Sequence, residues 1–150
     1  MNREFKYKAF ITYAHRDEEK ARWLRKKLES FRVPKHLIGK SSAFGPVPAR
    51  LYPIFRDRDE LAGAAQLGPL SEQALHDSSH LIVLCSPHAV KSRWGNEEIL
   101  MFKAMGKADR VLCLVLEGEP MVSEAGGDEN RECLPLACLL YTSDAADERS

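Results

Sequence analysis

Four short apolar segments, separated by polar stretches, organise this chain of 150 residues. They lie at residues 8–13, 51–55, 80–85 and 110–116, and their length and β-branched content are typical of strands. Between the first two, apolar residues recur at helical spacing, at Ala21, Leu24, Leu28 and Phe31. The pattern therefore predicts strands that alternate with helices, which is typical of an α/β fold.

Residues that favour helix ends mark the predicted helices. Asp17 is expected to cap the first helix, and Pro34 is expected to end it. Pro69 fits the first position of a short second helix, because the N–H that proline lacks would have no partner within the helix there. A third helix follows the third strand and ends near Lys107.

The strands also carry signals of their order in the sheet. Pro53 removes a hydrogen-bond donor from the middle of the second strand, which confines that strand to a sheet edge. The third and fourth strands are apolar at successive positions, which is typical of parallel strands covered on both faces. We therefore predict an open parallel sheet of order 2-1-3-4, in which ligands bind beyond the carboxyl ends of strands one and three. Residues 13–17 and 86–98 lie at that point.

A carboxylate on an apolar helix face is the main chemical signal in the chain. On a helical wheel of the third helix, Glu98 projects inside the apolar arc, whereas Glu97 lies nearer its edge. The arc consists of Trp94, Ile99, Met101, Phe102 and Met105. Burying a carboxylate is costly unless a partner or a reaction uses it. Two interpretations stay open on this ground alone: a structural carboxylate paired with an arginine, or a functional one.

Composition argues against several classes of partner. The 22 Lys and Arg balance the 22 Asp and Glu, so nothing favours nucleic acid or an anionic membrane. No apolar run approaches the roughly 20 residues of a membrane span, and the N-terminus lacks an apolar signal segment. Cys85 and Cys113 lie in apolar runs, as expected of buried, reduced thiols, and Cys133 and Cys138 have no second metal-like pair. We therefore expect no metal and a cytoplasmic location.

Four motifs occur in order along the chain. They are residues 9–17 (AFITYAHRD), residues 54–61 (IFRDRDEL) with the Gly/Ala-rich stretch after them, residues 81–87 (LIVLCSP), and Ser92-Arg93-Trp94 with Glu98 four residues after the tryptophan. Each motif alone is weak, but together, at these spacings, they resemble a Toll/interleukin-1 receptor (TIR) domain of the bacterial kind over about residues 5–120. This resemblance implies a flavodoxin-like three-layer sandwich with strand order 2-1-3-4-5.

Many TIR domains cleave NAD⁺, and in these the glutamate four residues after the tryptophan of the third helix is catalytic. The resemblance therefore implies that Glu98, rather than Glu97, is the catalytic residue of an NAD⁺ nucleosidase. Such an enzyme breaks the bond between nicotinamide and ribose and releases ADP-ribose or a cyclised form. NAD⁺ is then the substrate, and no cofactor is implied. Nicotinamide leaves as a neutral molecule, so the chemistry needs a negative charge beside the oxocarbenium-like ribose rather than a general acid or a metal.

The resemblance also implies a set of substrate-binding residues, namely Tyr13, His15, Arg16, Arg56, Ser86 and Trp94. The first three lie in the first loop, where this family contacts the nucleotide, and Arg16 either meets the pyrophosphate or is a solvated surface residue. Arg56 and Arg58 either reach substrate or a partner, or belong to a solvated loop. Ser86 either bonds the ribose or caps a helix, and Trp94 is either a pocket wall or part of the core. We interpret Asp17 as a cap rather than a ligand.

Three functions compete. The first is an NAD⁺ hydrolase or cyclase in bacterial defence or signalling, silent until an upstream trigger assembles it with other TIR domains through the BB loop, about Arg56–Gly68. The second is a non-enzymatic module that signals through TIR–TIR contacts alone. The third is another flavodoxin-like enzyme, such as a nucleoside deoxyribosyltransferase, which also uses a glutamate to cleave a glycosidic bond. A phosphoacceptor receiver domain is excluded, because the third strand ends in Cys85-Ser86 without the required aspartate.

The chain is expected to divide into three parts. Residues 5–122 form the TIR domain, C-terminally incomplete, with its fifth strand and last helix missing or truncated. Residues 123–138 are a loop or the remnant of the next element. Residues 139–150 show no apolar period, and we expect a non-native or disordered tail.

Overall fold

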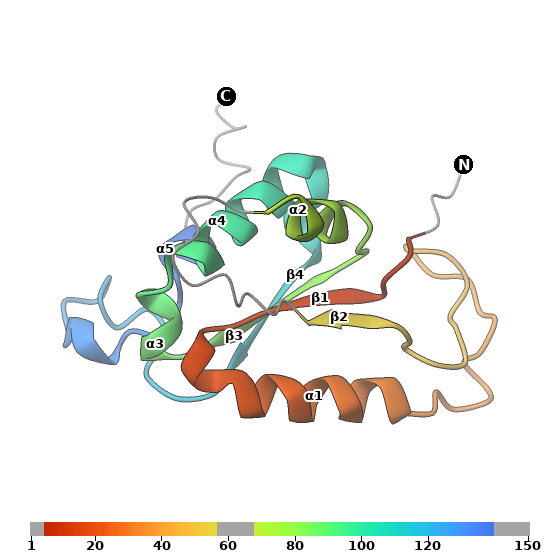
Figure 1. Ribbon diagram of the computed structural model, residues 1–150. Coiled ribbons are helices and arrows are strands. Elements are labelled where there is room, and N and C mark those ends of the chain that lie inside the picture. Colours follow the sequence, from red (N-terminus) through yellow and green to blue (C-terminus); the bar gives the residue numbers. More distant parts are fainter. Residues whose placement is uncertain (1–4, 57–67, 140–150) are drawn as a thin grey trace, which may run out of the picture.

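Four parallel strands form the centre of the molecule, in the order β2-β1-β3-β4 (Figure 1). The computed structural model describes residues 5–56 and 68–139. The strands are β1 (Ala9–Thr12), β2 (Ile54–Arg56), β3 (Leu81–Cys85) and β4 (Val111–Val115). The predicted α/β class and strand order are therefore confirmed. Pro53 lies immediately before β2, and its carbonyl oxygen accepts a hydrogen bond from the backbone N–H of Lys8.

Five helices surround the described sheet: α1 (Glu18–Ser30), α2 (Pro69–His76), α3 (Pro87–Val90), α4 (Arg93–Phe102) and α5 (Leu136–Leu139). Pro69 is the first residue of α2, and a π-helical turn carries α4 on to Lys107, both as predicted. The first helix ends at Ser30, earlier than predicted, because Phe31 already has an extended backbone, with ψ at 132°. Among the described residues, each helix is too short or too polar to span a bilayer.

The alternation of side chains along β1 divides the core into two layers. Ile11 points toward α1 and packs in one cluster with Ala21. Phe10 points to the opposite face, where it packs in a second cluster with Leu75 of α2 and Phe102 of α4. Figure 1 shows the result, with α1 below the sheet and α2 and α4 above it. This is the predicted three-layer arrangement.

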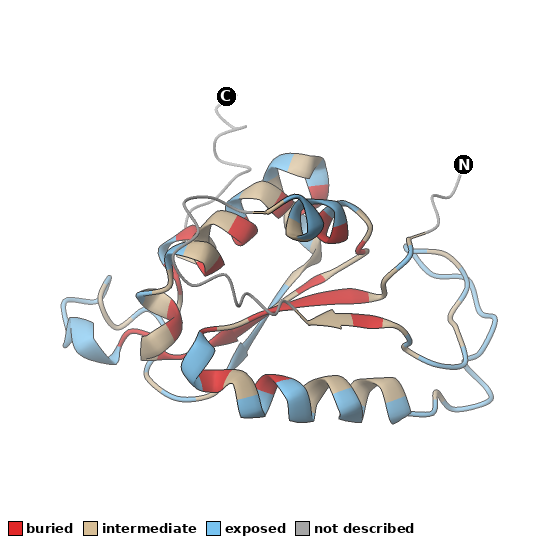
Figure 2. Cartoon of the chain, viewed as in Figure 1, coloured by how far each residue is buried: buried red, intermediate tan, exposed pale blue. Residues whose placement is uncertain are grey.

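The fourth strand departs from this coverage. Leu112 is 54% exposed and Leu114 is 41% exposed, and β4 is largely pale blue in Figure 2. The prediction that β4 is covered on both faces is therefore wrong, as is the burial expected of Cys113, which is exposed. The physical reason is position: β4 is the edge of the described sheet, whereas α1 packs mainly on β2, and α4 contacts β3.

A buried carboxylate organises the segment that follows β4. Glu132 is buried, and its Oε2 accepts hydrogen bonds from the backbone N–H groups of Met121 (2.9 Å), Cys133 (3.1 Å) and Leu134 (3.0 Å). Its Oε1 accepts from the N–H and the hydroxyl of Ser123, at 3.1 and 2.6 Å. Between β4 and the end of the described chain, the one isolated β-bridge pairs Glu119 with Glu132, and both residues lie within this segment. The described part of this region is thus a loop closed by one side chain, and the sheet described has four strands.

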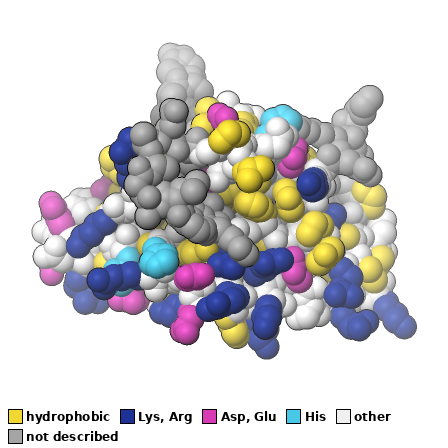
Figure 3. Space-filling view, in the orientation of Figure 1, with side chains coloured by type: hydrophobic (Ala, Val, Ile, Leu, Met, Phe, Trp, Pro, Cys, Tyr) yellow, Lys and Arg dark blue, Asp and Glu magenta, His cyan; other side chains and the backbone are white. Residues whose placement is uncertain are grey.

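Charge is unevenly distributed although its sum is zero. The sequence of α1, EEKARWLRKKLES, carries five cations against three anions. In Figure 3, Lys and Arg side chains gather along the lower side of the molecule, where α1 runs. The surface of this layer therefore attracts anions at low ionic strength, and the attraction weakens with added salt.

The Glu132 contacts generate a pH-dependent prediction. Burial by itself raises the pKa of Glu132, but the hydrogen bonds from Ser123, Leu134 and Met121 outweigh this and lower the pKa from 4.5 to about 2. Glu132 therefore contributes stability above about pH 4.5, and this contribution is lost as the pH falls toward 2. We expect Glu132→Gln to lower the free energy of unfolding by about 2 kcal/mol at pH 7, measured by urea denaturation.

The difference between the parent and this variant should narrow as the pH falls from 4.5 to 2. Glu129→Gln, which alters an exposed glutamate three residues earlier, serves as the matched control and should follow the parent at every pH. A difference between parent and Glu132→Gln that stays constant with pH would show that the ionised carboxylate does not hold the loop.

Candidate active site

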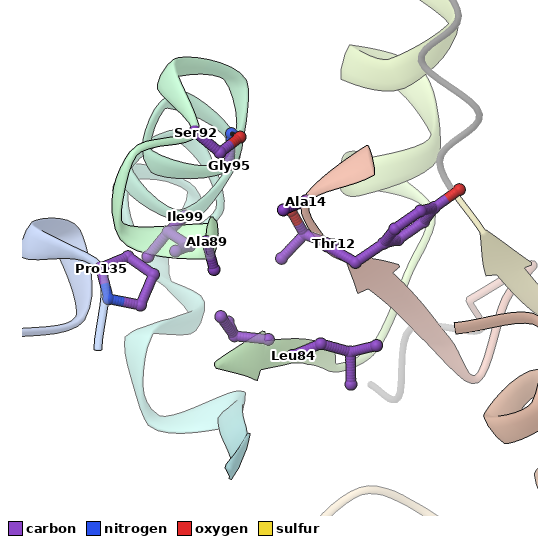
Figure 4. A pocket seen from close by; sticks show the side chains of 10 residues that line it. Thr12, Ala14, Leu84, Ala89, Ser92, Gly95, Ile99 and Pro135 are labelled. Atoms are coloured by element: carbon purple, nitrogen blue, oxygen red, sulfur yellow. Dashed lines mark hydrogen bonds between the residues drawn. The ribbon is translucent and has the colours of Figure 1, made fainter. Parts of the chain in front are cut away.

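A small hollow opens where the carboxyl ends of β1 and β3 meet the start of α4 (Figure 4). Its walls come from several parts of the fold: the end of β1 and the loop after it (Thr12, Tyr13, Ala14), β3 (Val83, Leu84), α3 (Ala89), the start of α4 (Ser92, Gly95, Ile99), and Pro135. The cavity volume is only about 10 Å³, close to the roughly 10–15 Å³ that a single water molecule needs. The position is the crevice predicted from the strand order.

The start of α4 is fixed by a capping residue. Ser92 is the N-cap, and its hydroxyl oxygen accepts the backbone N–H of Gly95 at 3.1 Å. The side of α4 turned toward the sheet carries Gly95, Glu98, Ile99 and Phe102, which are all buried. Glu98 is 1% exposed, so the prediction that it projects into the apolar face is confirmed.

Glu97, the neighbouring carboxylate, lies in different surroundings. It is partly exposed, and it pairs with Arg93 one turn earlier, at 3.4 Å between Oε2 and Nε. The guanidinium of Arg93 also lies over the ring of Trp94, 5.3 Å from its centroid. Trp94 is itself partly buried, at the edge of the apolar face, so both interpretations of this residue remain open.

Glu98 meets a hydroxyl from the central strand. The Oγ1 of Thr12, the last residue of β1, donates a hydrogen bond of 2.5 Å to Oε1 of Glu98. Both residues are buried, with 2% of Thr12 exposed. Thr12 was not among the predicted site residues, although its place two residues after Phe10 puts it on the sheet face that α4 covers.

A second buried carboxylate joins the first loop to the end of β3. Asp17 occupies the N-cap position of α1, but its side chain makes no capping hydrogen bond, so the predicted capping role is wrong. Its Oδ2 instead accepts the hydroxyl of Ser86 at 2.6 Å. The Ser86 oxygen in turn accepts the N–H of Ala89 at 3.1 Å and so caps α3. Of the two roles predicted for Ser86, the ribose contact and the helix cap, the structure shows the helix cap.

An arginine at the end of β2 reaches the same loop. Nη1 of Arg56 donates to the hydroxyl of Tyr13 at 3.0 Å and lies 3.4 Å from Oε2 of Glu18. The Arg56 side chain is 9% exposed, and its Nε is buried with no hydrogen-bond partner among the described residues. Tyr13 lines the hollow, so the structure brings these two predicted site residues together.

The other predicted residues are more scattered. His15 and Arg16 lie in a 3₁₀ turn between β1 and α1, and both are exposed, outside the lining of the hollow. Residues 57–67 of the predicted BB loop, which include Arg58 and Gly63, lie outside the described residues. Within residues 5–56 and 68–139, no group of three or more His, Cys, Asp or Glu side chains is placed to hold a metal ion.

Comparisons with known proteins agree with this geometry. The family model of the TIR-like domain of Thoeris protein ThsB matches residues 10–120. The chain is 34% identical over 83 residues to the NAD(+) hydrolase ApTIR of Actinoplanes sp., covering 55% of this chain and 12% of that protein's length. Among solved structures, the TIR domains of the activated Roq1 resistosome recognising the pathogen effector XopQ match with a TM-score of 0.55. That match has 14% identity and covers 95% of this chain and 76% of that chain.

The strand order and the switch-point crevice define an open parallel α/β protein, and the likeness to the resistosome domains concerns this fold alone. The family model spans well over half of the chain, so the protein belongs to the family of TIR-like domains typified by ThsB.

The Asp17–Ser86 contact generates a stability prediction. Ser86→Ala removes the hydroxyl that Asp17 accepts and the cap of α3, so we expect a loss of about 2–3 kcal/mol in the free energy of unfolding. Asp17→Asn keeps the shape without the charge and should cost less. Ser42→Ala, at an exposed serine whose hydroxyl bonds a loop carbonyl, is the matched control and should change stability by less than about 0.5 kcal/mol. Equal losses for Ser42→Ala and Ser86→Ala would contradict the structural role of the buried pair.

Proposed function

We propose that this protein cleaves the N-glycosidic bond between nicotinamide and ribose in NAD⁺, with Glu98 as the catalytic carboxylate. The observation that carries the proposal is the buried Glu98 on α4, four residues after Trp94 and beside the hollow at the ends of β1 and β3. The 34% identity to a protein named as an NAD(+) hydrolase supports the same chemistry.

The proposed reaction suits a lone carboxylate. The bond between the anomeric carbon and the pyridinium nitrogen breaks, and its electron pair leaves with neutral nicotinamide. Positive charge then develops on the ribose ring, and an anionic carboxylate in a water-poor site stabilises it. Water adds to the anomeric carbon and releases a proton, giving ADP-ribose, or a nucleophile of the same molecule adds and gives a cyclic product. NAD⁺ is the substrate, and the reaction as written uses no cofactor.

Residues around the hollow supply the proposed binding contacts. Arg56 is nearly buried beside Tyr13, and its Nε has no partner among the described residues, which supports a contact with the pyrophosphate. Arg16, exposed on the first loop, is a second cation for the same group, and His15 flanks it. Ser86 contributes a ribose contact only if its hydroxyl leaves Asp17.

The closed geometry supports the proposal that activity is conditional. Glu98 is 1% exposed, and the hollow lined by the described residues is too small for a dinucleotide, so we infer that residues around it move before substrate enters. We infer that assembly with other TIR domains, through a loop at about Arg56–Gly68, provides this opening in a bacterial defence or signalling setting within the cytoplasm.

Two alternatives are separated by assay. The same closed geometry favours a non-enzymatic signalling module, which would release no nicotinamide at any concentration or after tethering. A nucleoside deoxyribosyltransferase-like enzyme would also use a glutamate, but nucleosides would then compete with NAD⁺ for the site.

The test compares the two adjacent glutamates. With concentrated or tethered protein, we expect Glu98→Gln to lower the rate of nicotinamide release at least about 100-fold, because the ribose loses its stabilising negative charge. Glu97→Gln, at a partly exposed carboxylate on the same helix, is the matched control and should stay within about threefold of the parent. Equal release by the parent and Glu98→Gln would refute the catalytic assignment.

A further inference from the structure

Thr12 occupies a position that the packing alone would give to an apolar residue. It is 2% exposed and shares a sheet face with Phe10, in a layer where Leu81, Val83 and Phe102 are also buried. A valine would fill the same volume without a polar atom. Burying a hydroxyl costs free energy unless it finds a partner, so the threonine is explained by what its hydroxyl binds.

The partner is the carboxylate of Glu98, at 2.5 Å between Oγ1 and Oε1. The threonine hydroxyl donates this bond, and the carboxylate oxygen accepts it. The donor is held rigidly, because β1 is paired with β2 on one side and with β3 on the other, and Thr12 itself is in register with Val83. The hydroxyl therefore offers a fixed dipole to a buried charge, at no cost of reorganisation.

Gly95 borders this contact on α4, although the space beside Thr12 would also admit a Cβ at an ordinary van der Waals distance. It lies one turn before Glu98 on the buried side of α4. A Cβ at this position would lie 3.2 Å from Oγ of Ser92 and 3.7 Å from Oγ1 of Thr12. Both the threonine and the glycine line the hollow, and Glu98 lies behind them, bonded to Thr12.

We propose that Thr12 is a positioning residue for the NAD⁺-cleaving reaction: its hydroxyl orients the Glu98 carboxylate and stabilises its negative charge, so that the charge faces the ribose as positive charge develops there. This inference rests on the function proposed above. Thr12 acts through Glu98 and contributes to the chemical step rather than to substrate binding.

Two substitutions at Thr12 separate the hydroxyl from the methyl group. Thr12→Val keeps the shape and removes the donor, so kcat for nicotinamide release should fall about 10- to 100-fold while KM changes less than about threefold. Thr12→Ser keeps the donor and loses a buried methyl, so it should lower the thermal unfolding midpoint but keep kcat within about threefold. Ser78→Ala is the matched control, since Ser78 is a fully buried hydroxyl that donates to the carbonyl of Ala74 instead. It should lose stability and keep kcat.

A double-mutant cycle with Glu98→Gln tests the link between the two residues. In the Glu98→Gln background, Thr12→Val should leave the remaining rate unchanged, because the group it positions is no longer charged. The same four proteins, followed by urea unfolding, should show coupling between the two positions independently of activity.

The outcomes are distinct. If the parent and Glu98→Gln differ in rate but Thr12→Val keeps the parent's kcat, the positioning role is wrong and the proposed function stands. If Thr12→Ser loses kcat as Thr12→Val does, the methyl group and not the hydroxyl is responsible, and the proposal is overturned. If the parent releases no nicotinamide, the proposed function fails and the catalytic role of Thr12 fails with it, whatever the unfolding cycle shows.

Discussion

A carboxylate buried between the central strand and a helix is the constraint on which the rest of this structure depends. Removing an unpaired carboxylate from water costs several kcal/mol, so α4 can pack on the sheet only where a donor meets Glu98. Thr12 supplies that donor at the end of β1. Strand β1 lies inside the sheet between β2 and β3, and Gly95 of α4 lies beside its carboxyl end.

The same burial gives the site two properties that oppose each other. In the proposed reaction, a water-poor environment would strengthen the effect of a Glu98 carboxylate on the developing cation. It also closes the carboxylate to a substrate as large as a dinucleotide, since the hollow beside it is small. At such a site the carboxylate would be in place but substrate could not enter. A conformational or assembly step that opens the site would then control the proposed activity.

Sequence reasoning succeeded where one local feature decides the outcome. Pro53 indicates the correct edge position for the second strand, although it lies immediately before β2 and not within it, and the helical wheel places Glu98 rather than Glu97 on the buried face. It failed where the outcome depends on a partner from another element. Asp17 has the residue type of a cap, but Ser86, 69 positions later, takes its carboxylate. The apolar sequence of β4 does not indicate whether a helix covers the strand. The role of Thr12 depends on its contact with Glu98 of α4, which the sequence of β1 alone does not indicate.

The most direct measurement of the central claim is a crystal structure of the Glu98→Gln variant with NAD⁺ bound. We expect the nucleotide to bind between the end of β1 and the start of α4. A hydroxyl of the nicotinamide-bearing ribose should lie within hydrogen-bond distance of the side chain at position 98. A nucleotide bound elsewhere, or a ribose held away from this position, would contradict the assignment of Glu98 as the residue that acts on the glycosidic bond.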